Sequence, residues 1–488
     1  MVRNPLLQTP ATMFRFNPKF IAALLLSVGC LTPGLAQTRI SLQECIQQAI
    51  RENLQIKDAE LQQESTINTY QQSRRDRMPA VSGVFNPGYS LGRSIDPYTN
   101  SITTDHLGTN SLGITASWTI YNGNQLQNLQ KQNALNLSAG QYDLQAAKNM
   151  ITLKVLQAYL QVLVTQELLQ VALKQAEATQ LQLDRMTRQV QLQVVAEANL
   201  YNLQSQRAND DLQITNARNE VRTAQMALSQ LLNWPADQNY ELEAIAREVT
   251  AAPVESWQQV YRSSLTILPE SKSAALRIQS ARKGMEAARG LRMPTLSLNS
   301  SLGTSYSSAA KKYVTGDSYR EEPLNAFVTV NNERYQLSSI SQATSTQNMG
   351  YLEQLGNNPV WSVSLSLRIP IFNANQASYR IQEAKIQQLR ADNQQKQVHL
   401  QMRQQIEQAF VLYRNALERQ QTHQRQVEVL EKTVHAAQVR LEAGVVNVLD
   451  YTLAKTNLDR ARASLIQATY ECAFRQQIIG FYQSGTLN

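Results

Sequence analysis

The side chains that most often perform chemistry in proteins are few and scattered in this sequence of 488 residues. The histidines stand at His106, His399, His423 and His435, and their spacing matches no metal-ligand motif. No G-x-S-x-G, Walker loop, H-E-x-x-H or C-x-x-C motif occurs. The sequence therefore predicts no enzyme, no metal site and no cofactor, and the function has to be sought in the elements that the chain forms.

The first residues have the pattern of a secretory signal peptide. A basic stretch ends at Lys19, an apolar run follows from Phe20 to Gly29, and small residues precede a cleavage position after Ala36. We expect residues 1–36 to be removed. Cleavage before Cys30, with a lipid on its thiol, stays open as an alternative.

The composition favours long helices with polar faces over a compact core. Mean hydropathy is −0.38, and aromatic residues make up 7% of the chain. The net charge is +8, but both signs are mixed along the chain, whereas a nucleic-acid surface gathers positive charge with aromatic residues. We therefore expect no nucleic-acid partner. Cys45 and Cys472 are either two small buried residues or one disulfide.

Two long stretches carry the spacing of coiled-coil helices. Gln141 to Trp234 contains neither glycine nor proline. Its small and apolar residues recur every 3.5 positions: Ile151, Val155, Ala158, Val162, Thr165, Leu169, Ala172, Ala176, Thr179, Leu183, Met186 and Val190. The second stretch, from Ile371 to Ala443, repeats the pattern: Ala409, Tyr413, Ala416, Gln420, His423, Val427, Leu430, Val434, Ala437 and Leu441. About 70 helical residues span about 100 Å, which suits a structure that bridges a distance.

Four shorter segments alternate between apolar and polar residues, as β-strands with two different faces do. They lie near Val81 to Leu91, Leu112 to Ile120, Leu296 to Leu302 and Trp361 to Ile369. A tilted β-strand of about 9 to 11 residues is long enough to cross a bilayer. No run of 18 apolar residues follows the signal, so we expect any membrane crossing to use these strands. A soluble β-sandwich would also alternate and remains the other interpretation.

Aromatic residues near the strand ends fit the position of membrane-interface side chains. These residues are Trp118, Tyr121, Trp361 and Phe372.

The two halves of the chain repeat one pattern. Pro294 lies 215 residues after Pro79, and Ile371 lies 251 residues after Ile120. The additional residues fall in the polar stretch 307–359, between the two strands of the second half. We therefore expect a loop there that faces solvent.

In four segments the chain resembles the TolC-like outer-membrane efflux proteins: Ser41 to Leu54, Ser117 to Gly123, Ala287 to Ser297 and Arg440 to Asp450. The resemblance covers nearly all of the chain after the signal. It implies an α+β membrane protein with a two-fold internal repeat, in which three copies pool four strands each into a twelve-stranded β-barrel. Long helices would form a coiled-coil barrel, the tunnel across the periplasm.

The same resemblance implies a passive exit duct of a tripartite efflux or type I secretion system. Its localisation would be the outer membrane, extending into the periplasm. Its partners would be two further copies of the chain, a periplasmic adaptor protein, an inner-membrane transporter and outer-membrane lipid. The expected organisation is a signal peptide (1–36), a first repeat (37–233), an equatorial connector (234–255) and a second repeat (256–488).

The resemblance also assigns roles at the ends of the helical hairpins. The expected adaptor contacts are Arg440, Leu441, Gly444, Val445, Val194 and Val195. Asp450 would face the tunnel at a gate, where three copies form an acidic ring that favours cations. Leu453 stands where the family has a second acid, so we do not expect a double ring. A plain helix end at Gly444 and a solvated Asp450 remain the simpler alternatives.

The competing hypothesis is a secreted coiled-coil protein that forms an adhesive or structural rod. It accounts for the heptads but not for four alternating strands at matched places. Extraction as a detergent-dependent trimer would separate the two hypotheses.

Overall fold

The computed structural model describes residues 39–95, 100–104, 106–235, 240–244, 256–443 and 445–486. The expected signal peptide, Cys30, Gly444 and most of the expected connector 234–255 lie outside these residues. The chain forms two compact units, each made of three segments. The first is Met1–Arg51, Lys154–Arg247 and Thr433–Ile466, and the second is Glu52–Leu153, Glu248–Lys432 and Gln467–Asn488.

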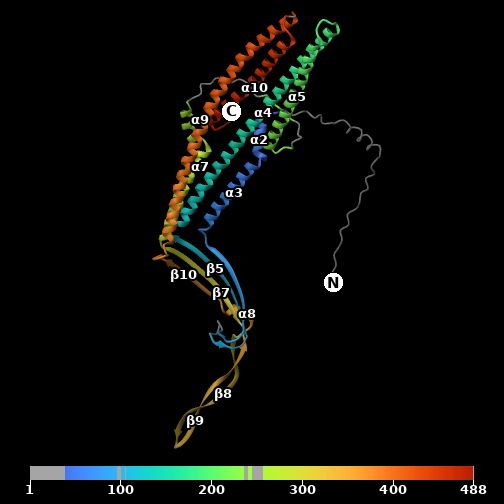
Figure 1. The fold of residues 1–488 in the computed structure, drawn as a ribbon. Helices are drawn as coiled ribbons and strands as arrows, with labels where there is room; N and C mark the ends of the chain where they lie inside the picture. The colour runs from blue at the N-terminus through green and yellow to red at the C-terminus, as the bar shows by residue number, and fades with distance from the viewer. Residues whose placement is uncertain are drawn as a thin grey trace, which may run out of the picture. The chain divides into compact units, whose positions relative to one another are not determined.

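Long helices dominate both units (Figure 1). Two of them are equal in length: α4 (Gln125–Gln191) and α9 (Gln376–Glu442) each have 67 residues. Each is followed by a return helix, α5 (Glu197–Leu232) or α10 (Val448–Ser484). The predicted apolar seams are buried at many of their positions, which confirms the coiled-coil spacing. The buried seam residues are Ile151, Val155, Val162, Thr165, Ala176, Thr179, Met186, Ala409, Tyr413, Ala416 and Val427.

In the first unit, a short parallel pair of strands is fastened to α4. The strands β1 (Arg39–Ile40) and β6 (Glu241–Leu242) pair in parallel. Buried Tyr159 of α4 places its hydroxyl 2.6 Å from the Glu243 carbonyl oxygen and 3.1 Å from that of Ile40. The phenol thus joins the C-terminal ends of both strands to the long helix.

The helices that precede the sheet strands are each broken once. Asn53 separates α2 (Leu42–Glu52) from α3 (Leu54–Arg75), because its backbone is extended and its side chain accepts the Gln55 N–H. Leu268 separates α6 (Trp257–Ile267) from α7 (Pro269–Arg289). Proline offers no N–H and forces the preceding residue out of the helical region.

In the second unit, helices α3, α4, α7 and α9 lie side by side (Figure 1). A Cβ on Gly140 of α4 would meet the Thr66 hydroxyl of α3 at 3.2 Å. Ser280 of α7 donates to the Asn136 side chain of α4 at 2.6 Å. Arg292, three residues beyond the end of α7, donates to the Ser378 hydroxyl of α9 at 2.9 Å. The order of the four helices is therefore α3, α4, α7, α9.

One antiparallel sheet of four strands completes the second unit. Its order is β10-β7-β5-β2, with β2 (Ala80–Ser90), β5 (Leu107–Asn122), β7 (Thr295–Ser307) and β10 (Val360–Arg368). All four predicted strands are therefore present, and they share one sheet (Figure 1). The strands β2 and β10 form its two edges.

Both connections from sheet to long helix take the left-handed conformation at two successive residues. After β5 these are Gly123 and Asn124, with φ of 64° and 60°. After β10 they are Ala374 and Asn375, with φ of 48° and 65°. Glycine and asparagine tolerate this region, whereas alanine is strained there. The same turn geometry thus precedes α4 and α9.

The polar segment 307–359 is more regular than the loop that the sequence predicted. It forms a long hairpin of β8 (Lys311–Val330) and β9 (Glu333–Asn348), followed by helix α8 (Tyr351–Asn357). The hairpin extends beyond the sheet (Figure 1). The sequence did not indicate these strands, because both faces of the hairpin are exposed. Its residues therefore do not alternate between apolar and polar.

Candidate functional site

The four-stranded sheet has one apolar face that runs across all its strands. Leu365 of β10 pairs with Leu298 of β7, which pairs with Trp118 of β5. Two residues further along β7, Ser300 pairs with Val363 of β10 and with Ala116 of β5, and Ala116 pairs with Val81 of β2. The other face is polar, and the Ser301 and Ser362 hydroxyls meet on it at 2.8 Å.

This apolar face is exposed in the single chain. Leu365 and Leu367 are 63% and 61% exposed, and Phe85 on β2 is 60% exposed. An apolar surface of this kind on a protein marks a contact with another apolar phase or partner. The two edge strands add rows of backbone groups that can accept further strands.

The predicted interface aromatics occupy different levels of the sheet. Trp118 pairs with Leu298, whereas Trp361 pairs with Leu302, four residues further along β7 and therefore about 13 Å away. Each indole N–H finds an oxygen: Trp118 donates to the Arg77 carbonyl at 2.9 Å and Trp361 to the Ser300 hydroxyl at 3.2 Å.

Tyr121 and Phe372 lie where strand becomes turn. Tyr121 is near the end of β5 and Phe372 follows β10. Both rings are exposed, Phe372 by 87%. Along β7, Tyr121 pairs with Leu296, two residues from the partner of Trp118, whereas the partner of Trp361 lies four residues away on the other side.

A hydrophobic cluster joins the ends of the two helical hairpins in the first unit. Met186, Leu203 and Val448 are buried in it, and Val195 and Leu441 pack against it. Two of the expected adaptor residues, Val195 and Leu441, therefore hold the hairpin ends together.

The other expected adaptor residues point outward where the structure describes them. Val194 and Val445 are 70% and 72% exposed, and Arg440 is exposed as well. Gly444 lies outside the described residues. The structure therefore separates the expected set into a packed pair and an exposed group.

The first hairpin end turns without glycine. Gln193 takes the left-handed conformation, with φ of 56°. Its N–H donates to the Val190 carbonyl at 2.8 Å, and the N–H of Val194 reaches back to Gln189 at 3.0 Å. This pair of bonds is a Schellman motif, in which glutamine occupies the position that usually holds glycine.

Asp450 lies in the first turn of α10 and is exposed. Its N–H donates to the Asn447 side chain at 2.9 Å, so Asn447 caps the helix. An acid in the first turn is also favoured by the helix dipole. The residue is free to face either a tunnel or ordinary solvent.

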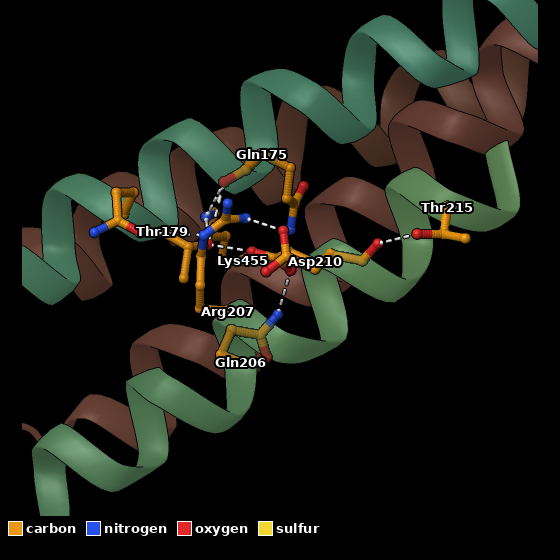
Figure 2. Close-up of polar contacts among 9 residues, drawn as sticks. Gln175, Thr179, Gln206, Arg207, Asp210, Thr215 and Lys455 are labelled. Atoms are coloured by element: carbon orange, nitrogen blue, oxygen red, sulfur yellow. Dashed lines mark hydrogen bonds and ion pairs between the residues drawn. The ribbon is translucent and has the colours of Figure 1, made fainter. Parts of the chain in front are cut away.

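A buried polar cluster, which the sequence reasoning missed, lies deeper in the first unit (Figure 2). Asp210 of α5 is 1% exposed and accepts hydrogen bonds from Thr179 of α4 and, at 2.8 Å, from Gln206. The Lys455 ammonium of α10 donates to the Thr179 hydroxyl at 2.9 Å and to the Gln175 carbonyl at 3.2 Å. Three helices therefore meet through one cation and one buried carboxylate.

A second carboxylate, Asp459, belongs to the same cluster. Burial is the main cause that raises its pKa to about 6, and Lys455 and Arg462 oppose the shift. Burial also lowers the pKa of the Lys455 ammonium, against the attraction of Asp459 and Asp210. One sequence signal could have found this cluster: Thr179 is a polar residue at a seam position, where polar groups need buried partners.

The described histidines and acids do not form a metal-binding arrangement. Across the described ranges, no group of three or more His, Cys, Asp or Glu side chains is placed to hold a metal ion. The two described cysteines, Cys45 and Cys472, are free thiols.

Among the helices described by the structure, none combines the length and the apolar character needed to cross a bilayer.

Comparison with known proteins gives the family. The outer membrane efflux protein family matches residues 45–233 and 261–477. This match covers most of the sequence, and the chain therefore belongs to the outer membrane efflux protein family. No curated protein matches the chain significantly.

Solved structures share the fold at low sequence identity. The chain is similar to CusC, described with conformational changes on folding and transmembrane channel formation, with a TM-score of 0.72, 17% identity and 91% of both chains covered. It is similar to the outer-membrane channel OprN, with a TM-score of 0.70, 17% identity and 91% and 89% covered. It is also similar to the Campylobacter jejuni CmeC outer membrane channel, with a TM-score of 0.67 and 15% identity. That match covers 99% of this chain and 94% of the CmeC chain.

Proposed function

We propose that this protein is the outer-membrane exit duct of a tripartite efflux or type I secretion system. Three copies would form a passive conduit that crosses the outer membrane and the periplasm. The observation that carries this proposal is the four-stranded sheet, with one continuous apolar face and two unpaired edges. Family membership supports the same conclusion.

The strand directions allow the sheet to close around a ring of copies. Each neighbouring pair in the order β10-β7-β5-β2 is antiparallel, so β10 and β2 run in opposite directions. Placing β2 of one copy beside β10 of the next therefore continues the antiparallel pattern. Closure of the ring removes both edges of the sheet. This is required in a bilayer, because lipid cannot hydrogen-bond the backbone groups of an open edge. The apolar face would then contact lipid and the serine-rich face would line water.

The hairpin ends would form the periplasmic entrance. The exposed residues Val194, Val445 and Arg440 are suited to contact an adaptor protein, whereas Leu441 and Val195 fix the shape of the surface from inside. Exposure of Asp450 supports its place at the gate. An inner-membrane transporter would supply the energy, as the family resemblance implies.

Fractionation and bilayer recording test this function. We expect the mature protein to remain in outer membranes after salt washing, to require detergent for extraction and to run at three times the mass of one chain. Reconstituted protein should conduct ions across a planar bilayer. A water-soluble monomer or filament that gives no conductance would overturn the proposal and favour the secreted rod.

A further inference from the structure

Helix α8 packs on the apolar face of the four-stranded sheet, at the end from which the hairpin of β8 and β9 extends (Figure 1). The hydroxyl of Thr304 on β7 donates to the Leu355 carbonyl of α8 at 2.9 Å. Alternate residues of a strand share a face, so Thr304 lies on the face that carries Leu302 and Leu298. In the proposed duct this face meets lipid, and α8 therefore lies on the lipid-facing side of the sheet.

A buried glutamine fixes α8 in this place. The side chain of Gln354 accepts the Ser307 N–H at 2.8 Å and donates to the carbonyls of Ser307 and Met349 at 2.9 Å and 2.8 Å. The ring of Tyr351 packs on that of Tyr306, with centroids 4.9 Å apart. A helix this short is not stable alone in water, and these contacts hold it against the sheet.

An apolar groove of about 550 Å³ lies between α8 and the sheet. A Cβ on Gly83 of β2 would meet no atom within 4 Å, so this glycine leaves the floor of the groove open. Preformed sites of about 300–1,000 Å³ with apolar walls are typical for small apolar ligands. The residues that form the walls and floor include Gly83, Phe85, Leu112, Ile114, Leu302 and Leu355.

The groove lies at the outer limit of the apolar face. Two residues beyond Thr304 on β7, Tyr306 pairs with Asn110 of β5, and the face becomes polar there. The helices begin at the opposite end of the sheet, and the proposed duct places them in the periplasm. A hydrocarbon chain in the groove would therefore have its headgroup at the outer surface of the membrane.

Basic side chains follow directly beyond this polar end. Lys311 and Lys312 are the first two residues of β8, and Arg93 follows β2 by three residues and is exposed. The Lys312 ammonium is 3.1 Å from the Glu353 carboxylate of α8, which places one of these cations beside the helix that walls the groove. Cations at the membrane surface attract the phosphates of lipid headgroups. An apolar groove below basic side chains is complementary to a phosphorylated lipid.

We propose that this groove binds an acyl chain of a phosphorylated glycolipid of the outer leaflet, with its phosphate beside Lys311 and Lys312. A neighbouring copy would add its β10 to the edge of β2 and leave the groove open, because strands pair through their edges and not through their faces. The outer-leaflet position rests on the proposed function. Binding of the lipid by the groove is measured on the isolated protein.

Lipid titration of the detergent-purified, full-length trimer tests the groove. The probe is diphosphoryl lipid A, added to delipidated protein and counted by native mass spectrometry, and we expect saturation at one molecule per chain. Gly83→Leu places its side chain in the open space of the groove and should lower the affinity about tenfold, because the acyl chain loses contact with the floor. Unchanged affinity in this variant would overturn the site.

The matched control is Val81→Leu, which enlarges the same face of β2 two residues away from Gly83. Its affinity should equal that of the unmodified protein, and a loss as large as that in Gly83→Leu would contradict the groove. Leu355→Ala removes part of the wall without filling the groove and should also weaken binding. This second variant decides the site if Gly83→Leu does not assemble.

Recognition of the phosphate is tested by charge. Replacing both lysines, Lys311→Gln with Lys312→Gln, should lower the affinity for diphosphoryl lipid A about tenfold and leave that for its dephosphorylated form unchanged. Arg320→Gln with Arg334→Gln removes the same charge from exposed positions further along the hairpin and should have no effect. Equal affinity of the unmodified protein for both forms would overturn phosphate recognition. If phosphatidylglycerol binds as tightly, the glycolipid is the wrong occupant.

Conductance of the same preparation separates the lipid site from the duct. A trimer that conducts ions but shows no saturable binding of lipid A would refute the groove and leave the duct intact. Protein that neither forms a trimer nor conducts would contradict the duct. Titration of the purified chains would then still decide whether the groove binds the lipid.

Discussion

Burial sets the chemical behaviour of single residues in this protein, as Cys45 shows. Its side chain is 0% exposed. Burial first, and the charge of Glu44 second, raise the pKa of its thiol to about 12. The reactive thiolate is therefore scarce at pH 8.

We predict that native Cys45 reacts with a maleimide at least about a hundredfold more slowly than an ordinary thiol at pH 8. The comparison is a cysteine introduced by Val445→Cys, at a position that is 72% exposed. Mass spectrometry of the labelled peptides gives both rates in one sample. Similar rates in the native protein would show that Cys45 is accessible, whereas both should react alike after unfolding.

At the proposed gate, we predict that Asp450→Ala raises single-channel conductance or weakens cation preference. Removing three exposed carboxylates from a narrow ring takes away the local negative potential. The control is Asp317→Ala, which removes an exposed carboxylate from the hairpin of β8 and β9. Unchanged current and selectivity in Asp450→Ala would place this acid in plain solvent.

Sequence reasoning could reach Asp450 but not the buried polar cluster. Asp450 follows the hairpin end at a fixed spacing, so a resemblance points to it. Asp210 and Lys455 stand among many polar residues on long helices, and sequence alone does not distinguish a buried charge from a solvated one. Their burial depends on how three helices pack together.

At the scale of elements, the spacing of apolar residues predicted the positions of the strands and of the helix seams. The four strands and the apolar seams appear where their spacing placed them. The apolar period does not indicate the helix breaks at Asn53 and Leu268, because single residues cause them without changing that period. The strands β8 and β9 were missed because their exposed faces carry no alternation.

The hairpin of β8 and β9 is closed at its base, where the Met349 N–H donates to the Ala310 carbonyl at 3.0 Å. We predict that replacing residues 311–348 with a two-residue turn leaves the trimer and its conductance intact. The four-stranded sheet shares no strand with this hairpin, so its pairing does not depend on it. Size-exclusion chromatography and bilayer recording check the result.

A matched control for the excision removes a strand of the sheet itself. Deleting β10 takes away the edge on which closure depends and should abolish the trimer. If excision of the hairpin has the same effect as deletion of β10, the hairpin takes part in assembly.

At the scale of the whole molecule, the proposed function depends on which face of the sheet meets lipid. We predict that Leu365→Arg prevents assembly in the outer membrane, because a charge on a lipid-facing strand near the midplane costs about 2–4 kcal/mol in each copy. Ser364→Arg is the control, since the neighbouring residue lies on the opposite face of β10. Detergent extraction and trimer yield give the readout. Equal yields of the two variants would contradict the assigned faces.

The unpaired edges of the sheet also have a consequence before assembly. A newly exported chain carries β2 and β10 uncovered, together with a broad apolar face, and either edge can recruit a wrong strand. Correct association of the chains then competes kinetically with aggregation. Periplasmic chaperones that shield extended apolar segments should therefore determine the yield of this protein, and overproduction without them should give inclusion material.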